Sequence, residues 1–255
     1  MTTNKSFKLP FIIFLTVYFT YLVVSQTPAT WVAWAIQQSL PNTALTSING
    51  TVWKGSAASL QIDIGPSTLP MGTLKWTLSP LSMLSLSPCI TFSTDLPGQS
   101  VSGELCSSVS GARTVHNLKV DAPVSHIQSL LPTQAEGRIS LEIIDAELDS
   151  EMNIIDLDGR FSWQNARVNV DDNWFTLGSY AAKLSESDKS GIAAEIFDLS
   201  GNYGVLLDAT WIMAQPWRIA GTVTPKDGAS PMVREALQTL GEERDAGAYY
   251  VQWPL

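Results

Sequence analysis

The chain has 255 residues, of which 45% are hydrophobic and only 15% are charged, and its formal net charge is −9. This length suffices for one large domain or two small ones with a sizeable core. The negative charge argues against a nucleic-acid partner, whose phosphates need a basic face, and against docking on anionic lipid by charge. Contact with a membrane must therefore come from burial of apolar residues.

An apolar run over residues 7–24 carries one charge, Lys8. About 18 residues is the lower limit for a helix that spans a membrane. Lys5 and Lys8 precede the run and the next basic residue is Lys54, so the positive-inside bias places the N-terminus in the cytoplasm. We therefore predict a cytoplasmic N-terminus over 1–8, a transmembrane anchor over 9–25, a juxtamembrane helix or linker over 26–42 and a periplasmic β-rich domain over 43–255.

A cleaved signal peptide is the alternative to this anchor. Residues 23–25, Val-Val-Ser, would make an acceptable cleavage site. The apolar run is longer, however, than the apolar region of about 7–15 residues that is usual in a signal peptide. We favour the anchor, and both interpretations export the body of the protein.

Two tryptophans, Trp31 and Trp34, follow the apolar run and lie one helical turn apart. Tryptophan at this spacing beside an anchor is typical of the membrane interface, and we assign both residues to it. The alternative is a helix that packs both side chains on the domain. The sequence does not choose between the two.

Beyond Pro41, apolar residues recur at every second position. The clearest alternation lies in residues 60–64, 74–78, 139–143, 157–163, 205–213 and 217–223. It predicts half-buried, mainly antiparallel strands. About a dozen such strands are too many for one flat sheet. We predict a mainly β fold, in which one curved antiparallel sheet forms a groove or half-open barrel. Its inner face would carry Leu74, Trp76, Leu78, Phe161 and Trp163.

Short helices are expected at three places in this sheet. The clearest covers residues 230–241, where Ser230 fits the N-cap, Pro231 the first helical position and Gly241 the position after the last turn. A shorter helix should follow Pro123, and one more turn should begin near Ser79.

Cys89 and Cys106 are the only cysteines. A hairpin folded about Pro97-Gly98 places Cys89 opposite Cys106 and Ile90 opposite Leu105. This register sorts apolar and polar side chains onto opposite faces, as a one-sided sheet requires. Directly opposed residues lie within reach of a disulfide. We predict this cross-strand disulfide, with two free thiols as the alternative.

No motif in the chain points to catalysis or to a cofactor. His116 and His126 have no metal-ligand partners at suitable spacing. The acid-rich stretch over 142–158 could hold Ca²⁺, but acids that alternate with Ile and Leu are also what the wet face of a strand needs. A nucleophile elbow, a P-loop and a dinucleotide fingerprint are all absent from the sequence. We predict no enzymatic activity, no metal and no other cofactor.

Residues 48–57 read INGTVWKGSA. We interpret them as the first strand or hairpin of the sheet, where Gly50 and Gly55 permit a bulge or a close approach of strands. Trp53 is then a packing residue. The alternative is a platform that binds a ligand or docks a partner.

Several segments together carry a family resemblance. In chain order they are residues 29–32, ATWV; residues 48–57, INGTVWKGSA; residues 72–81, GTLKWTLSPL; residues 158–168, DGRFSWQNARV; residues 219–225, IAGTVTP; and residues 236–241, ALQTLG. In this order and over nearly the whole chain they resemble the type II secretion system protein N family. The motif residues are Gly50, Trp53, Gly55, Trp76, Pro80, Gly159 and Trp163.

The resemblance implies a single-pass inner-membrane protein of Gram-negative bacteria with a periplasmic β-rich domain. It implies an accessory or assembly role in the machine that exports folded proteins across the outer membrane, and no catalytic residue. The partners would be other secretion subunits, bound in the membrane or at exposed strand edges. The alternative function is a periplasmic carrier of lipid or another apolar ligand, because a curved sheet with a dry inner face can also form a lipid groove.

Overall fold

The computed structural model describes residues 8–63, 68–170, 172–187, 191–213, 215–244 and 247–254. The expectations for residues 1–7, for Ile64 and for Leu255 lie outside these ranges.

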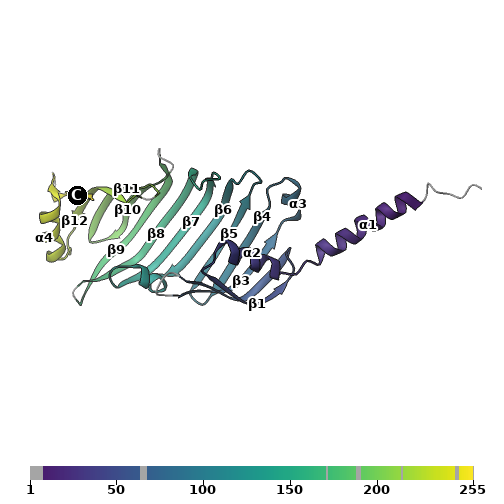
Figure 1. Cartoon of the computed structure of the whole chain (residues 1–255). Helices are drawn as coiled ribbons and strands as arrows, with labels where there is room; N and C mark the ends of the chain where they lie inside the picture. Colours follow the sequence, from purple (N-terminus) through teal and green to yellow (C-terminus); the bar gives the residue numbers. More distant parts are fainter. Residues whose placement is uncertain are drawn as a thin grey trace, which may run out of the picture.

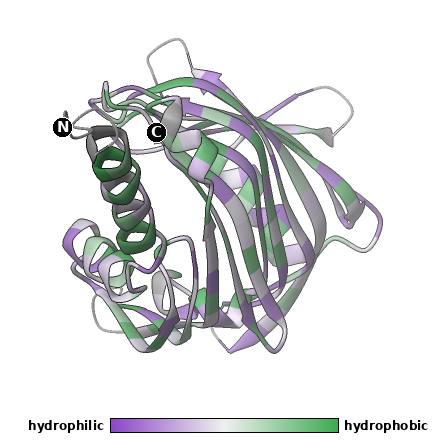
Figure 2. Ribbon diagram, turned by 90° about the vertical axis from the view of Figure 1, so that its right-hand side faces the viewer, coloured by the Kyte–Doolittle hydropathy of each residue, from purple (hydrophilic) through white to green (hydrophobic). Residues whose placement is uncertain are grey.

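The described residues contain 14 strands in one antiparallel sheet (Figure 1). The strands are β1 (Thr43–Gly50), β2 (Lys54–Asp63), β3 (Thr68–Leu78), β4 (Cys89–Leu96), β5 (Gln99–Ser107), β6 (Arg113–Pro123), β7 (Ala135–Leu148), β8 (Ile154–Val170), β9 (Asn173–Ser187), β10 (Gly191–Gly201), β11 (Tyr203–Trp211), β12 (Arg218–Pro225), β13 (Glu242–Glu243) and β14 (Tyr249–Trp253). Strands β1 to β12 are neighbours in chain order, and β14 and then β13 complete the sheet. Figure 2 shows the sheet bent into a trough. The predicted curved antiparallel sheet is confirmed.

Five helices accompany the sheet in the described part of the chain. They are α1 (Lys8–Ser25), α2 (Thr30–Ser39), α3 (Pro80–Leu84), the 3₁₀ helix η1 (Val124–Leu130) and α4 (Pro231–Leu240). The three short helices expected within the sheet are present. Gly241, however, does not adopt a left-handed conformation after α4, since its φ is −110°. A side chain there would instead lie 2.9 Å from the Leu237 carbonyl oxygen, so close approach explains this glycine.

The sequence predicts a transmembrane anchor over 9–25. Helix α1 covers this range and most of the apolar run over 7–24. Nowhere in the described ranges is a helix both long enough and apolar enough to cross a membrane. The predicted transmembrane helix is therefore not confirmed.

One apolar face runs continuously across the sheet, and we call it the inner face. The strand register aligns inward residues from one strand to the next. One row runs Leu78, Ile90, Leu105, Val115, Ala146 and Leu157, and a second runs Gly159, Leu184, Ala194, Ala209, Ile219 and Trp253. Phe161 and Trp163 continue the face of Gly159 along β8, as their two-residue spacing requires.

The opposite, outer face carries ionisable side chains that contact one another between neighbouring strands. Lys119 pairs with Glu142 at 3.2 Å, and His116 Nδ1 lies 2.7 Å from Asp145 Oδ1. The acid-rich stretch over 142–158 thus contributes to the wet face of β7 and β8, in line with the strand interpretation of those acids.

The hairpin of β4 and β5 has the predicted register throughout. Cys89 lies opposite Cys106, Ile90 opposite Leu105 and Thr91 opposite Glu104. The two sulfur atoms are bonded, and the Cα atoms are 4.0 Å apart. The predicted disulfide is present in the structure.

Replacing both cysteines, in the variant Cys89→Ser/Cys106→Ser, should lower the free energy of unfolding by about 3 kcal/mol, because the unfolded chain regains the freedom of a loop of about 17 residues. Urea denaturation of the wild type and the variant measures the difference. Both cysteines of the wild type should resist alkylation until a reductant is added. Alkylation of either one without reductant would contradict the assignment.

Candidate functional site

The hairpin turn between β1 and β2 is bonded to the segment that leaves α1. The Trp53 indole N–H donates to the Val24 carbonyl oxygen at 2.8 Å. The Val52 N–H donates to the Thr27 carbonyl oxygen at 2.9 Å, and the Ala29 N–H donates to the Gly50 carbonyl oxygen at 3.1 Å. Val24 belongs to the last turn of α1, whose carbonyls have no partner within the helix. We call this set of contacts the junction, because it ties the end of α1 to the sheet.

Gly55 makes the close packing of the junction possible. A Cβ atom on Gly55 would lie 2.3 Å from the Trp76 indole ring. Trp76 is 3% exposed and donates its indole N–H to the Val52 carbonyl oxygen at 3.3 Å. Across the hairpin, Gly50 has a φ of +96°, which favours glycine. Gly50 therefore serves the turn, and Gly55 allows the Trp76 indole ring to approach the strand.

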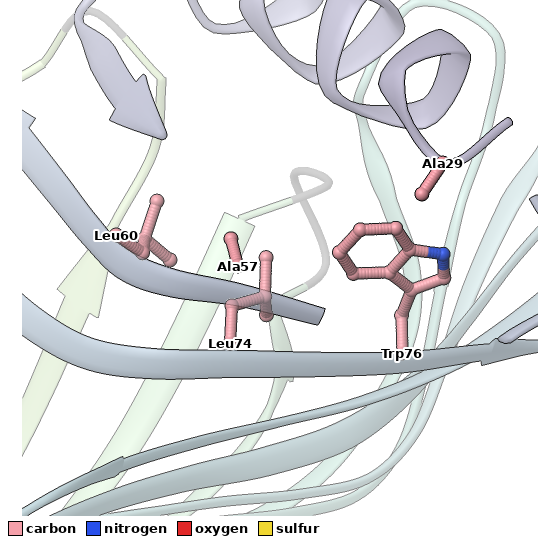
Figure 3. Close-up of a cluster of buried hydrophobic side chains, with 5 residues drawn as sticks. All are labelled: Ala29, Ala57, Leu60, Leu74 and Trp76. Carbon is pink, nitrogen blue, oxygen red and sulfur yellow. The ribbon is translucent and has the colours of Figure 1, made fainter. Parts of the chain in front are cut away.

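Helix α2 covers the inner face at the start of the sheet. Ala29, just before the helix, joins a buried cluster with Ala57, Leu60, Leu74 and Trp76 (Figure 3). Two further α2 residues, Val32 and Ile36, pack against this cluster. Trp76 is thus part of the core, as its inward position predicts.

Trp31 and Trp34 lie on the side of α2 away from this cluster. Their exposed fractions are 63% and 60%. The alternative in which α2 packs both side chains on the domain is therefore wrong. Their membrane-interface role stays a prediction.

Trp53 is half-buried, and its indole N–H is already engaged by Val24. A ligand platform would need an aromatic face or a polar atom that is free to bind. The arrangement favours packing, and the side chain links a helix to the sheet. The segment 48–57 is the β1–β2 hairpin that its sequence predicts.

A second feature is an apolar groove on the inner face of β8 to β12. Its volume is about 630 Å³, and none of its lining side chains is charged. The walls include Phe161, Trp163, Ile196, Leu207, Trp217 and Ile219. Small side chains, Ala182, Ala194 and Ala209, form a buried cluster of neighbouring strands beside these walls. The alanines leave the space that larger side chains fill elsewhere on this face.

Three of the lining side chains carry a polar atom, those of Trp163, Tyr180 and Trp217, and the first two donate to backbone carbonyls. The Trp163 indole N–H donates to the Glu136 carbonyl oxygen at 3.1 Å, and the Tyr180 hydroxyl donates to the Leu177 carbonyl oxygen at 2.9 Å. Burial, with a smaller effect of the Asp198 carboxylate, raises the pKa of Tyr180 to about 12. Tyr180 therefore stays neutral at physiological pH, and the groove is uncharged.

Pro80 and Gly159, two further motif residues, serve the local structure of the sheet and its helices. Pro80 is the first residue of α3. Gly159 faces Ile143 of β7, and a Cβ atom there would lie 2.8 Å from the Ile143 Cδ1 atom. Gly159 thus admits a bulky neighbour to the inner face.

Within the part of the chain that the structure describes, one cluster of metal-ligand side chains is compact enough to share an ion. It consists of Cys89, Glu104 and Cys106. The two sulfur atoms are bonded to each other, so they offer no thiolate to a metal. The cluster is a disulfide with an acidic neighbour.

Comparison with protein families gives one match. The model of "Type II secretion system (T2SS), protein N" matches residues 41–252. The chain belongs to the type II secretion system protein N family. Searches of curated proteins and of solved structures found no match.

In this member of the protein N family, the matched range begins just before β1 and ends in β14. It includes the β1–β2 hairpin, the disulfide and the groove, whereas α1 and α2 precede it. The resemblance based on the motif residues is confirmed. The sequence did not single out Ala182, Ala194, Ala209 or Tyr180, although small residues at inward positions of neighbouring strands were a signal for a groove.

The junction predicts opposite outcomes for two glycine-to-alanine changes in strands of this protein N chain. Gly55→Ala should lower the free energy of unfolding by about 1–3 kcal/mol, because the new Cβ atom would overlap the Trp76 ring. Gly204→Ala in β11 is the matched control, since its Cβ atom would meet nothing closer than 3.4 Å. It should be neutral or stabilise by up to about 1 kcal/mol. Chemical denaturation measures the free energy of unfolding of both variants. Equal changes would show that the close approach of Trp76 does not require a glycine at position 55.

Tyr180 should ionise only near pH 12, well above the value of about 10 for a tyrosine in an unfolded chain. Because the pKa is higher in the folded state, its contribution to stability is complete below about pH 10 and is lost as the pH rises through about 12. The measurement is a rapid-mixing titration of tyrosinate absorbance against pH. Subtracting the curve of the variant Tyr180→Phe from that of the wild type isolates the ionisation of Tyr180. A difference curve centred near pH 10 would show that the groove wall is open to water.

Proposed function

We propose that this protein is a non-enzymatic component of type II secretion that acts in the bacterial inner membrane and periplasm by binding other components of the machine. The family match over residues 41–252 carries the proposal, because it covers the sheet from β1 to β14. The family is associated with secretion as an accessory component, and this supports a role in assembly.

We further propose that α1 attaches the chain to the inner membrane and leaves the sheet in the periplasm. Apolar side chains are exposed all round α1, among them Phe11, Phe14 and Phe19 at 63–66%. A helix that is apolar on every side needs an apolar environment. The junction supports this placement, since it fixes the end of α1 to the sheet.

The free edge of β1 is our candidate contact for another subunit. β1 is an edge strand that pairs with β2 on one side. In the described ranges, no other strand pairs with its second side. Unpaired backbone groups at such an edge can accept a strand from a partner. At the other end of the sheet, the terminal strand β13 has only two residues. The longer edge therefore lies next to the junction.

Deletion of the gene in its native host should reduce the extracellular amount of type II secretion substrates and leave the folded substrates in the periplasm. Wild type and Gly204→Ala should restore secretion, and Gly55→Ala should restore it less well because the junction is disturbed. Fractionation of the envelope and immunoblots for substrate and protein provide the measurement. Unchanged extracellular substrate in the deletion strain would contradict the proposed function.

A further inference from the structure

The apolar groove on β8 to β12 lies away from the part of the inner face that α2 covers. The cluster with Ala29 and Trp76 belongs to the first strands, whereas the groove is lined by Phe161 to Ile219. Figure 1 places β8 to β12 at the end of the sheet remote from α1. A hollow of about 630 Å³ is within the range of about 300–1,000 Å³ typical of small-ligand sites.

The chemistry of the lining disfavours a polar ligand. No lining side chain is charged, the polar atoms of Trp163 and Tyr180 are bonded to backbone carbonyls, and the Trp217 indole N–H is the one further side-chain polar group among the lining residues. The backbone groups of the floor are paired within the sheet. An extended peptide or a sugar would therefore bury hydrogen-bonding groups without partners, which is unfavourable.

A docked helix could place only one of its faces in the groove, because the whole helix is larger than the hollow. An α-helix is about 10–12 Å in diameter, so even two turns, about 11 Å long, enclose roughly 1,000 Å³. The groove holds about 630 Å³. A narrow, flexible and fully apolar group fits better, and an acyl chain is such a group.

We propose that the groove binds an acyl chain of a membrane phospholipid and leaves the headgroup in water. A free fatty acid would present the same kind of chain with its carboxylate in water, so the choice of a phospholipid rests on the proposed membrane location of the protein. The exposed apolar helix α1 keeps the protein near a supply of phospholipid in the proposed membrane location. The groove is remote from α1 along the sheet, so the bound lipid has left the bilayer that α1 contacts (Figure 1).

The test uses the full chain in living cells, so that no detergent competes for the groove. Cells that incorporate a diazirine-bearing fatty acid into their phospholipids are irradiated, and the protein is purified and digested. Mass spectrometry then locates the label and weighs the adduct. We expect adducts with the mass of a phospholipid on residues of β8 to β12. Labelling confined to α1 and to Trp31 and Trp34, or adducts with the mass of the free fatty acid, would overturn the proposal.

Matched variants separate binding in the groove from labelling of the surface. Ala194→Leu and Ala209→Leu place larger side chains in the groove, whereas Ala193→Leu places the same side chain on the opposite face of β10. The first two should lower labelling of β8 to β12 about tenfold, because the added volume takes the place of the chain. Ala193→Leu should leave it unchanged, and melting temperatures show whether each variant is folded. Equal labelling in all three folded variants would contradict a site in the groove.

The result is independent of the secretion measurement. A strain with Ala194→Leu that loses the lipid label but secretes normally would leave the proposed function in place and show that lipid binding serves another purpose. A wild-type protein without label in the groove that still supports secretion would overturn the lipid site alone.

Discussion

The need to cover one apolar face governs this structure. In the described residues, strands β1 to β12 follow one another in chain order before β14 and β13, and the inner face of this sheet is apolar from β3 to β14. The hydrophobic effect favours removing that face from water. Among the residues that the structure describes, β1 pairs with β2 alone and the far end finishes in the short β13, so the sheet curves without closing. Coverage then comes from helices and from curvature, and in our proposal also from a bound acyl chain.

Coverage is uneven along the sheet. At the β1 end, Ala29 and α2 complete a buried cluster around Trp76. At the other end, alanines from three neighbouring strands leave a hollow on the same face. The difference is set by side-chain volume: a large indole and a helix fill one end, whereas methyl groups leave the other open. In the proposed role, the first region holds the protein together, and the second provides its ligand site.

The junction gives a structural role to the β1–β2 hairpin, one of the segments on which the family resemblance rests. Trp53 reaches back to the last turn of α1, and Trp76 lies over Gly55. The same few residues therefore build the first strands, bury an indole and fix the direction in which α1 leaves the sheet. In the proposed membrane role, this connection holds the sheet to α1, and no reactive side chain is required to make it.

Local patterns in the sequence were sufficient to determine the strands, their inward faces and the pairing of Cys89 with Cys106, because alternation and hairpin register depend on residues close in the chain. They also identified the family through its glycine and tryptophan motifs. The sequence left open whether Trp31 packs on the domain, and it did not find the bond from Trp53 to Val24, which joins residues 29 positions apart. It did not locate the groove either. Those features depend on how a helix crosses the sheet and on how side chains from five strands meet, and only the curvature of the folded sheet decides them.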